Sequence, residues 1–311
     1  KAYIEANKFN IAGPKLNGAE IEEQKLHLIN KIYAYGYLLH RYKDSNRPWY
    51  VFAMDNKPSE EGESHGGTGK SIAFKSLSYF MNTVNLDGRN RRLTDNPFIY
   101  ERVTEHTDYI LIDDADQYLN FSFFFAPLTG NLTINPKFGK QFSLPFEKVP
   151  KFAITSNFTL RNLDPSTERR LLYTVFSDYY HYNTNNEYNE NRSPKDDFGK
   201  NLFQDFNETE WNLFFNTAAY CCSTYLNYPK IEPPLNNVLK RNLITEMGAS
   251  FLDWAEVYFN ADRLNTLKKK KEAFDDFVKG NNIKHQTPQN FAKRVAAFCR
   301  YKNYVLNPPE M

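Results

Sequence analysis

Apolar and polar positions divide the middle of the chain into short strands and amphipathic helices. Residues 49–54, Trp-Tyr-Val-Phe-Ala-Met, carry no charge and are rich in aromatic and β-branched side chains, which predicts a buried strand. Beyond residue 71 the apolar spacing is i, i+4, i+7 and i+8, typical of a helix packed on a sheet; the residues are Ala73, Leu77, Phe80 and Met81. From Trp49 onward strand and helix patterns alternate, which indicates an α/β fold with a central, mostly parallel sheet.

Two further apolar runs end in polar clusters. The first, 109–112, leads into the paired carboxylates Asp113 and Asp114, and the second, 151–155, leads into Ser156 and Asn157. Ligands of parallel sheets gather outside the carboxyl ends of the strands, so these side chains are expected at one site.

The flanks of this region read as helical. Residues 1–48 predict a small helical domain, with an oligomerisation collar as one interpretation, and residues 49–230 form the predicted core. Residues 178–197 read as an exposed loop and 202–228 as a helix. A Pro-Pro linker near 231–234 opens a third domain, 231–311, with three helical patterns; Thr287 and Pro288 start the last one, and a winged-helix module is one reading of the whole.

A glycine-rich segment lies between the first strand and its helix. It comprises Ser64, His65, Gly66, Gly67, Thr68, Gly69, Lys70 and Ser71. In a strand–loop–helix context such a loop holds phosphate oxygens on backbone N–H groups, and the helix N-terminus adds partial positive charge. Lys70 would reach the β- and γ-phosphates and Ser71 would bind Mg²⁺. The pattern G-x-x-x-x-G-K-S/T has glycine where this chain has Ser64, so a glycine-rich surface turn is the alternative.

The polar cluster residues suit the same chemistry. Asp113 is assigned to the metal and Asp114 to the attacking water, while Asn157 can donate to the γ-phosphate or orient that water. A strand that ends in a carboxylate-rich turn is the alternative for the aspartates. Because Lys70 would supply charge rather than packing, Lys70→Ala is expected to abolish ATP hydrolysis and leave the fold intact.

Together, the glycine-rich loop, the hydrophobic run before Asp113 and Asp114, and the strand ending in Thr-Ser-Asn resemble a superfamily 3 helicase. These are AAA+-type ring ATPases of small DNA viruses, phages and plasmids. The stretch 49–182 most resembles the helicase half of phage or mobile-element primase–helicase proteins. The resemblance implies a P-loop NTPase core of AAA+ type, ATP and Mg²⁺ as cofactors, single-stranded DNA as partner, a homo-hexamer or another ring, and a primase or polymerase module upstream in the same chain.

The resemblance implies functional roles for two more segments. The stretch 128–140 resembles the family's pore hairpin, and Arg169 or Arg170 lies in the segment that resembles the one carrying the arginine finger. Lys137, Phe138 and Lys140 suit a hairpin tip that binds single-stranded DNA, because ammonium groups track phosphates and a ring stacks on a base. A solvated hairpin is the alternative for the tip, and ordinary surface ion pairs are the alternative for the arginines.

Composition narrows the class of protein. The 311 residues are 41% apolar and 24% charged, as in ordinary globular proteins, and no apolar run approaches the ~18 residues of a membrane span. The N-terminus has neither an initiator Met nor a signal-peptide core, so a fragment of a longer cytoplasmic protein is expected. The resemblance to superfamily 3 helicases implies a bacterial host or that of a phage or mobile element. The three cysteines show neither metal spacing nor a disulfide framework, which also fits the cytoplasm.

Charge is uneven along the chain. Residues 263–302 carry 11 Lys or Arg against 3 Asp or Glu, although the net charge of the whole chain is only +2. A basic terminal module on an acidic body suits a nucleic-acid partner, and a solvated helix face is the alternative. The expected function is therefore an ATP-dependent DNA helicase domain. The rival interpretations are an ATPase that does not unwind DNA, such as an initiator or loader, and a nucleic-acid-binding module with a degenerate nucleotide site.

Overall fold

The computed structural model describes residues 17–55, 67–116, 118–158, 167, 169–177, 179–180, 191–230, 243–244, 246–281 and 287–307. The chain divides into two compact units. The sheet unit comprises Lys1–Lys57 and Ser64–Pro234, and the helical unit comprises Pro58–Glu63 and Leu235–Met311. Within the described residues, no helix is long and apolar enough to cross a membrane.

A five-stranded parallel sheet forms the centre of the sheet unit, in the order β2-β3-β6-β1-β7. The strands are β1 (Tyr50–Asp55), β2 (Thr83–Asp87), β3 (Tyr109–Asp113), β6 (Lys151–Thr155) and β7 (Leu171–Phe176). The α/β class and the three strands expected from apolar runs are confirmed. Their parallel register, with Ile112 beside Ile154 and Ala53 beside Thr155, brings the polar strand ends to one edge.

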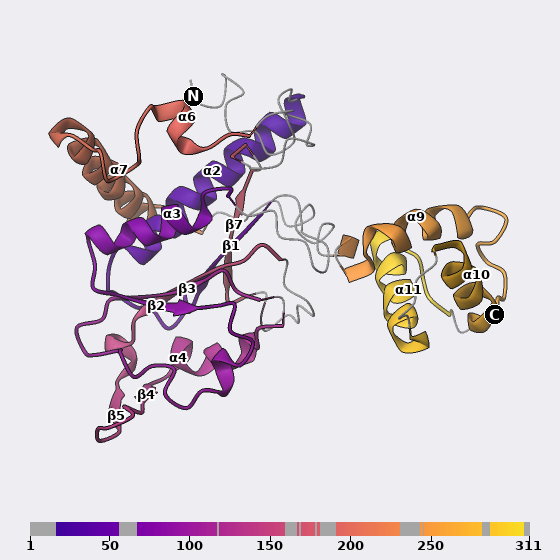
Figure 1. Ribbon diagram of the computed structural model, residues 1–311, viewed down its shortest axis with the longest axis horizontal. Helices are drawn as coiled ribbons and strands as arrows, with labels where there is room; N and C mark the ends of the chain where they lie inside the picture. Colours follow the sequence, from indigo (N-terminus) through magenta and orange to yellow (C-terminus); the bar gives the residue numbers. More distant parts are fainter. Residues whose placement is uncertain are drawn as a thin grey trace. The chain divides into compact units, whose positions relative to one another are not determined.

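Helices cover the two faces of the sheet (Figure 1). On one face lie α2 (Gly18–Leu38), α3 (Lys70–Lys75) and α7 (Glu208–Asn227), whose buried aromatic residues pack on alternate strand residues such as Val51 and Ala53. On the other face lie η3 (Phe121–Phe124) and α4 (Phe125–Thr129), where Phe124 packs at 6.2 Å from the Tyr50 ring. The period-two alternation of β1 therefore divides its side chains between two apolar layers.

The helix expected across residues 73–81 is shorter than its apolar spacing indicates. α3 ends at Lys75 and continues as the 3₁₀ helix η1 (Ser76–Tyr79). The Ser76 hydroxyl donates to the Ala73 carbonyl at 2.6 Å, and the Ser78 hydroxyl donates to the Lys75 carbonyl at 2.8 Å, so side chains compete for carbonyls that an α-helix would use. Phe80 then packs against α7, with its ring 4.9 Å from Phe214.

A short helix also lies inside the region expected to be a loop. α6 (Pro194–Phe198) begins at a capping box formed by Ser193 and Asp196, with proline in its first turn. The helix expected at 202–228 is observed as α7, which starts later, at Glu208, because Asn207 and Glu210 form its own capping box.

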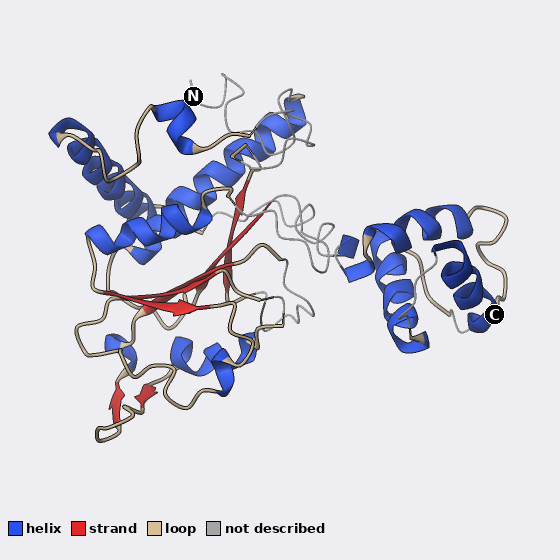
Figure 2. Ribbon diagram, viewed as in Figure 1, coloured by secondary structure: helices blue, strands red, loops and turns tan. Residues whose placement is uncertain are grey.

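An antiparallel hairpin completes the sheet unit. It consists of β4 (Leu132–Ile134) and β5 (Phe142–Leu144), and Figure 2 shows it as two short strands apart from the central sheet. Short 3₁₀ turns, η2 (Leu93–Asp95) and η4 (Phe146–Lys148), lie in the connecting segments.

The helical unit contains α9 (Ala249–Tyr258), α10 (Lys270–Asn281) and α11 (Pro288–Lys302) around an aromatic core of Phe251, Phe277, Phe291 and Phe298. α11 starts as predicted, because the Thr287 side chain accepts from the backbone N–H of Asn290 and Pro288 occupies the first turn. The described residues of this unit contain helices and turns but no strand, so they support a helical module and show no wing.

Candidate functional site

The described part of the glycine-rich loop follows the carboxyl end of β1. Gly67 and Gly69 adopt φ angles of 104° and 96°, a region that side-chain-bearing residues avoid. Gly69 also precedes the first residue of α3. Ser64, His65 and Gly66 lie outside the described residues. Glycine is therefore favoured at both positions directly before α3.

Lys70, the first residue of α3, is buried beside this loop. Its ammonium contacts Asp55 at the end of β1 and donates to Thr68 Oγ1 at 3.1 Å and to Asn157 Oδ1 at 3.0 Å. Both members of the Lys70–Asp55 pair are almost inaccessible, with side chains 6% and 4% exposed. A buried ion pair thus links Lys70 to the end of β1, and a hydrogen bond links it to Asn157 beyond β6, so Lys70 has partners in the folded interior in addition to its expected role at the phosphates.

Asp113 is held by three donors at the end of β3. Its Oδ1 accepts from Ser71 Oγ at 2.7 Å and Thr155 Oγ1 at 2.8 Å, while Lys75 Nζ lies 2.6 Å from Oδ2. Partial burial alone would raise the pKa of Asp113, but hydrogen bonds from Lys75, Ser71 and Thr155 outweigh it and lower the pKa below its usual value. Asp113 is therefore a carboxylate at neutral pH.

Asp114 is held on both of its carboxylate oxygens. Oδ1 accepts from Asn157 Nδ2 at 3.0 Å, and Oδ2 is paired with the guanidinium of Arg89. The backbone of Asp114 is left-handed, with φ 57°, and its N–H donates to Thr155 Oγ1 at 2.8 Å. Aspartate tolerates this conformation better than most residues, and here it turns the side chain toward Asn157.

Arg89 reaches Asp114 because the loop after β2 lies against the end of β3. The Gly88 N–H donates to the Asp113 carbonyl at 2.8 Å. A β-carbon at Gly88 would lie 2.6 Å from Cα of Ala115, so this approach requires glycine. The exposed Arg89 side chain is thereby anchored beside the carboxylate pair.

Five of the predicted site residues thus form one cluster, connected through Thr155: Lys70 and Ser71 from the loop prediction, and Asp113, Asp114 and Asn157 from the strand ends. The cluster lies where the sheet topology favours a ligand. After β1 the chain crosses to β2, and after the neighbouring β6 it crosses in the opposite direction to β7. Such a divergence opens a crevice outside the carboxyl ends of the two strands.

The structure places the remaining predicted residues elsewhere. Arg169 and Arg170 precede β7, and the Arg170 carbonyl accepts from the Tyr50 N–H at 2.8 Å, at the amino edge of the sheet. Lys137, Phe138 and Lys140 lie in the exposed turn of the β4–β5 hairpin. The Phe138 side chain is 95% exposed, and Lys137 Nζ lies 5.5 Å from the centre of its ring.

Sequence reasoning missed four residues of the cluster. Asp55 and Thr155 are the last residues of β1 and β6, so the rule that located Asp113 could have found them. Lys75 and Arg89 reach the site from the far end of α3 and from the loop after β2, which no local pattern indicates.

Ser71 and Asp113 are the residues that could hold a magnesium ion together with phosphate oxygens. The Ser71 hydroxyl and the Asp113 carboxylate meet at the mouth of the loop, and Mg²⁺ is commonly bound by one or two protein oxygens together with phosphates and waters. In the part of the chain that the structure describes, no group of three or more His, Cys, Asp or Glu could hold a metal ion.

No family model matches the sequence, and no curated protein matches it. Among solved structures, the chain is similar to one titled the A form apo structure of NrS-1 C terminal region-CTR, with 14% sequence identity and a TM-score of 0.38. The match covers 90% of this chain and 64% of that one, so the chain spans less than two thirds of that structure. At this TM-score the likeness carries no argument about function. The function is therefore inferred from the geometry of the site.

Proposed function

We propose that the chain is an ATP-dependent DNA helicase domain, with a P-loop NTPase core of AAA+ type that acts as a ring and moves along single-stranded DNA. The observation that carries the proposal is the cluster that joins Lys70, Ser71, Asp113, Asp114 and Asn157 at the divergence of β1 and β6. Each residue has the chemical character that phosphoryl transfer from ATP to water requires.

Each residue of the cluster has its own role in ATP hydrolysis. Lys70 would exchange its contact with Asp55 for the phosphates of ATP, and Ser71 and Asp113 would hold Mg²⁺. The metal, when bound with ATP, supplies charge that neutralises the phosphate oxygens. Asp114 accepts a proton from the attacking water, and Asn157 orients the Asp114 carboxylate and this water. Asn157 and Arg89 hold the carboxylate in place, and Oδ1, which accepts from Asn157, has a second lone pair that can accept the proton of the water.

The position of the arginines favours action on a neighbouring subunit. β7 has six residues, so Arg169 and Arg170 lie roughly 20 Å from the carboxyl edge of their own sheet. The Arg170 guanidinium packs 4.8 Å from the centre of the Phe125 ring, whereas Arg169 is exposed. Arg169 is therefore the arginine that completes the site of the next subunit in a ring.

Complementation tests this arrangement. Arg169→Ala and Lys70→Met subunits are each expected to be inactive alone, and mixing them is expected to restore part of the ATPase activity, because some interfaces then pair an intact Arg169 with an intact Lys70. Arg170→Ala serves as the matched arginine control. A monomer that hydrolyses ATP at full rate at any dilution would contradict the ring.

The hairpin supplies the contact to single-stranded DNA in this proposal. Its exposed turn presents two lysines and one almost fully exposed aromatic ring, a combination that binds phosphates and stacks on a base. A primase or polymerase module upstream in the full protein and a hexameric ring belong to the same proposal.

Two assays decide between this function and its rivals. Steady-state ATPase activity with and without single-stranded DNA tests the nucleotide site, and strand displacement on a forked duplex tests unwinding. An initiator or loader would hydrolyse ATP without displacing a strand. A binding module with a degenerate nucleotide site would bind DNA and hydrolyse nothing.

A further inference from the structure

The cluster fixes the direction in which a bound nucleoside triphosphate runs across the sheet. This step rests on the proposed function. The metal-binding Asp113 is the last residue of β3 and the water-activating Asp114 follows it, so the γ-phosphate lies toward β3 and β6. In the strand order β3-β6-β1-β7, the loop with Lys70 follows β1. The nucleoside therefore leaves the loop on the opposite side, over the carboxyl end of β7.

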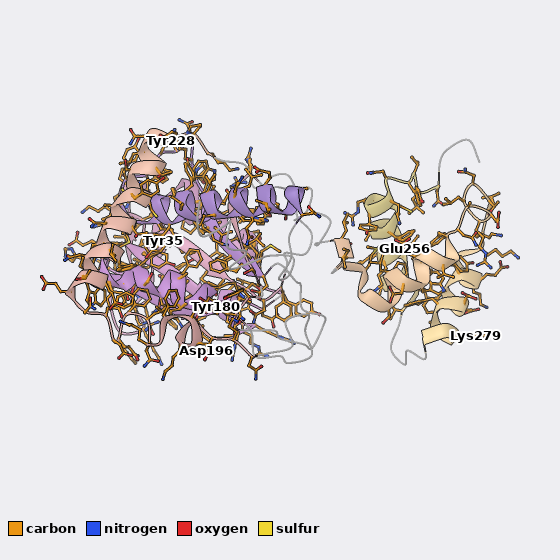
Figure 3. All side chains as sticks on the ribbon, turned by 90° about the horizontal axis from the view of Figure 1, so that it is seen from above. Tyr35, Tyr180, Asp196, Tyr228, Glu256 and Lys279 are labelled. Atoms are coloured by element: carbon orange, nitrogen blue, oxygen red, sulfur yellow. The ribbon has the colours of Figure 1, made fainter. Side chains whose placement is uncertain are left out.

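Two tyrosines follow β7 at that place. Tyr180 lies against the glycine-rich loop, since a methyl group added at Gly69 would be 4.0 Å from Tyr180 Cδ2. Tyr180 is half-buried and Tyr179 is buried. Figure 3 shows Tyr180 in the sheet unit near Asp196 of α6. An aromatic ring thus stands beside the phosphate loop on the side where the base must lie.

The Tyr180 ring is fixed in place by a carboxylate. Its hydroxyl donates to Asp197 Oδ2 at 3.2 Å, and the Tyr179 hydroxyl donates to Oδ1 of the same residue at 3.3 Å. The two rings meet edge to face, with centres 5.1 Å apart. Asp197 is itself held on α6, whose start is fixed by the capping box and by Pro194. The ring orientation is therefore set before a ligand arrives, which lowers the entropic cost of binding.

We propose that Tyr180 is the stacking platform for the base of the bound nucleoside triphosphate, and that Asp197 is a positioning residue that orients its ring. The face of a phenol ring offers a flat apolar surface to a purine. Stacking of one base on an aromatic side chain strengthens binding by about 5- to 150-fold in nucleic-acid-binding proteins. The contribution concerns the base alone, because the triphosphate is held by the loop and Lys70.

This separation gives a direct test. Calorimetric titrations of the whole chain with Mg·ATP and with Mg·tripolyphosphate compare a ligand that has a base with one that has none. Tyr180→Ala is expected to weaken ATP binding by about 5- to 150-fold and to leave tripolyphosphate binding within twofold of wild type. Tyr180→Phe keeps the ring and is expected to restore most of the ATP affinity. Asp197→Asn is expected to fall between wild type and Tyr180→Ala. Tyr228→Ala, which removes an exposed tyrosine at the end of α7, is the control.

The outcomes separate the base platform from the proposed function. Equal losses for ATP and tripolyphosphate in Tyr180→Ala, or no loss for ATP, would overturn the assignment of Tyr180. A wild-type chain that binds neither ligand would overturn both the platform and the nucleotide site. A chain that binds ATP through Tyr180 but hydrolyses none would retain the platform and refute the ATPase.

Discussion

Removing the Lys70 ammonium is expected to destabilise the sheet unit as well as to stop catalysis. The Lys70 and Asp55 side chains are only 6% and 4% exposed, so Lys70→Met leaves a carboxylate in the interior without the ammonium beside it. Breaking one side of a buried ion pair costs about 3–5 kcal/mol, mostly because the remaining charge stays desolvated. For a unit of this size, such a loss lowers the melting temperature by roughly 6–20 °C.

A double-substitution cycle isolates this cost. Replacing Asp55 by Asn in the Lys70→Met protein removes the orphaned charge and is expected to recover most of the lost stability, while hydrolysis stays abolished. Thermal or urea unfolding of wild type, both single variants and the double variant measures the coupling between the two sites.

Lys75→Met is the matched control, because it removes a lysine from the same helix whose side chain is 51% exposed and pairs with Asp113. Exposed pairs contribute at most about 1 kcal/mol, so the control is expected to melt close to wild type. A Lys70→Met protein that unfolds like wild type, or a double variant no more stable than Lys70→Met, would refute the reasoning.

Three further predictions address hydrolysis, DNA and pH. Asp114→Asn is expected to bind ATP like wild type and to lower the steady-state turnover number by about 100-fold or more, because the amide cannot accept a proton; wild-type turnover would remove Asp114 from catalysis. Replacing Lys137 and Lys140 by Ala is expected to abolish the stimulation of ATPase activity by single-stranded DNA and to reduce the slope of log affinity against log salt by about 1.4, with basal turnover kept; a double variant that separates a fork as fast as wild type would exclude the hairpin. Burial, followed by the charge of Lys43, lowers the pKa of Lys151 from its usual 10.5 to about 7. Unfolding therefore takes up a proton between these pH values, and the free energy of unfolding rises with pH there. Lys151→Met is expected to flatten this rise, measured as the change in melting temperature between pH 7 and pH 9, and an unchanged slope would contradict it.

The sequence by itself determined the strands and the residues that follow them. Runs such as 49–54 and 109–112 are apolar throughout, so both faces of each strand are buried. Burial on both faces is typical of strands in a parallel sheet. Asp113, Asp114 and Asn157 were predictable as neighbours, because parallel strands bring their carboxyl ends to one edge whatever their order. The unusual backbone of the loop was predictable too, because its sequence is rich in glycine. Gly67 and Gly69 do adopt left-handed angles.

Local patterns also overstated some elements. The apolar spacing through Met81 predicted a continuous helix, but Ser76 and Ser78 close the α-helical part after Lys75. The competition of serine hydroxyls for backbone carbonyls is a local effect. The two serines therefore indicated an early helix end that the spacing of apolar residues alone does not show.

Only the tertiary structure decided which partners the site residues have. Placing β6 between β1 and β3 brings Asn157 to both Lys70 and Asp114, and the loop after β2 brings Arg89 to Asp114. The burial of Lys70 with Asp55 and the approach of Tyr180 to Gly69 likewise join residues far apart in the chain. Hydrophobic periodicity predicts which face of a helix or strand is buried. Strand order and loop paths depend on packing between residues far apart in the chain, so a short stretch of sequence does not predict them.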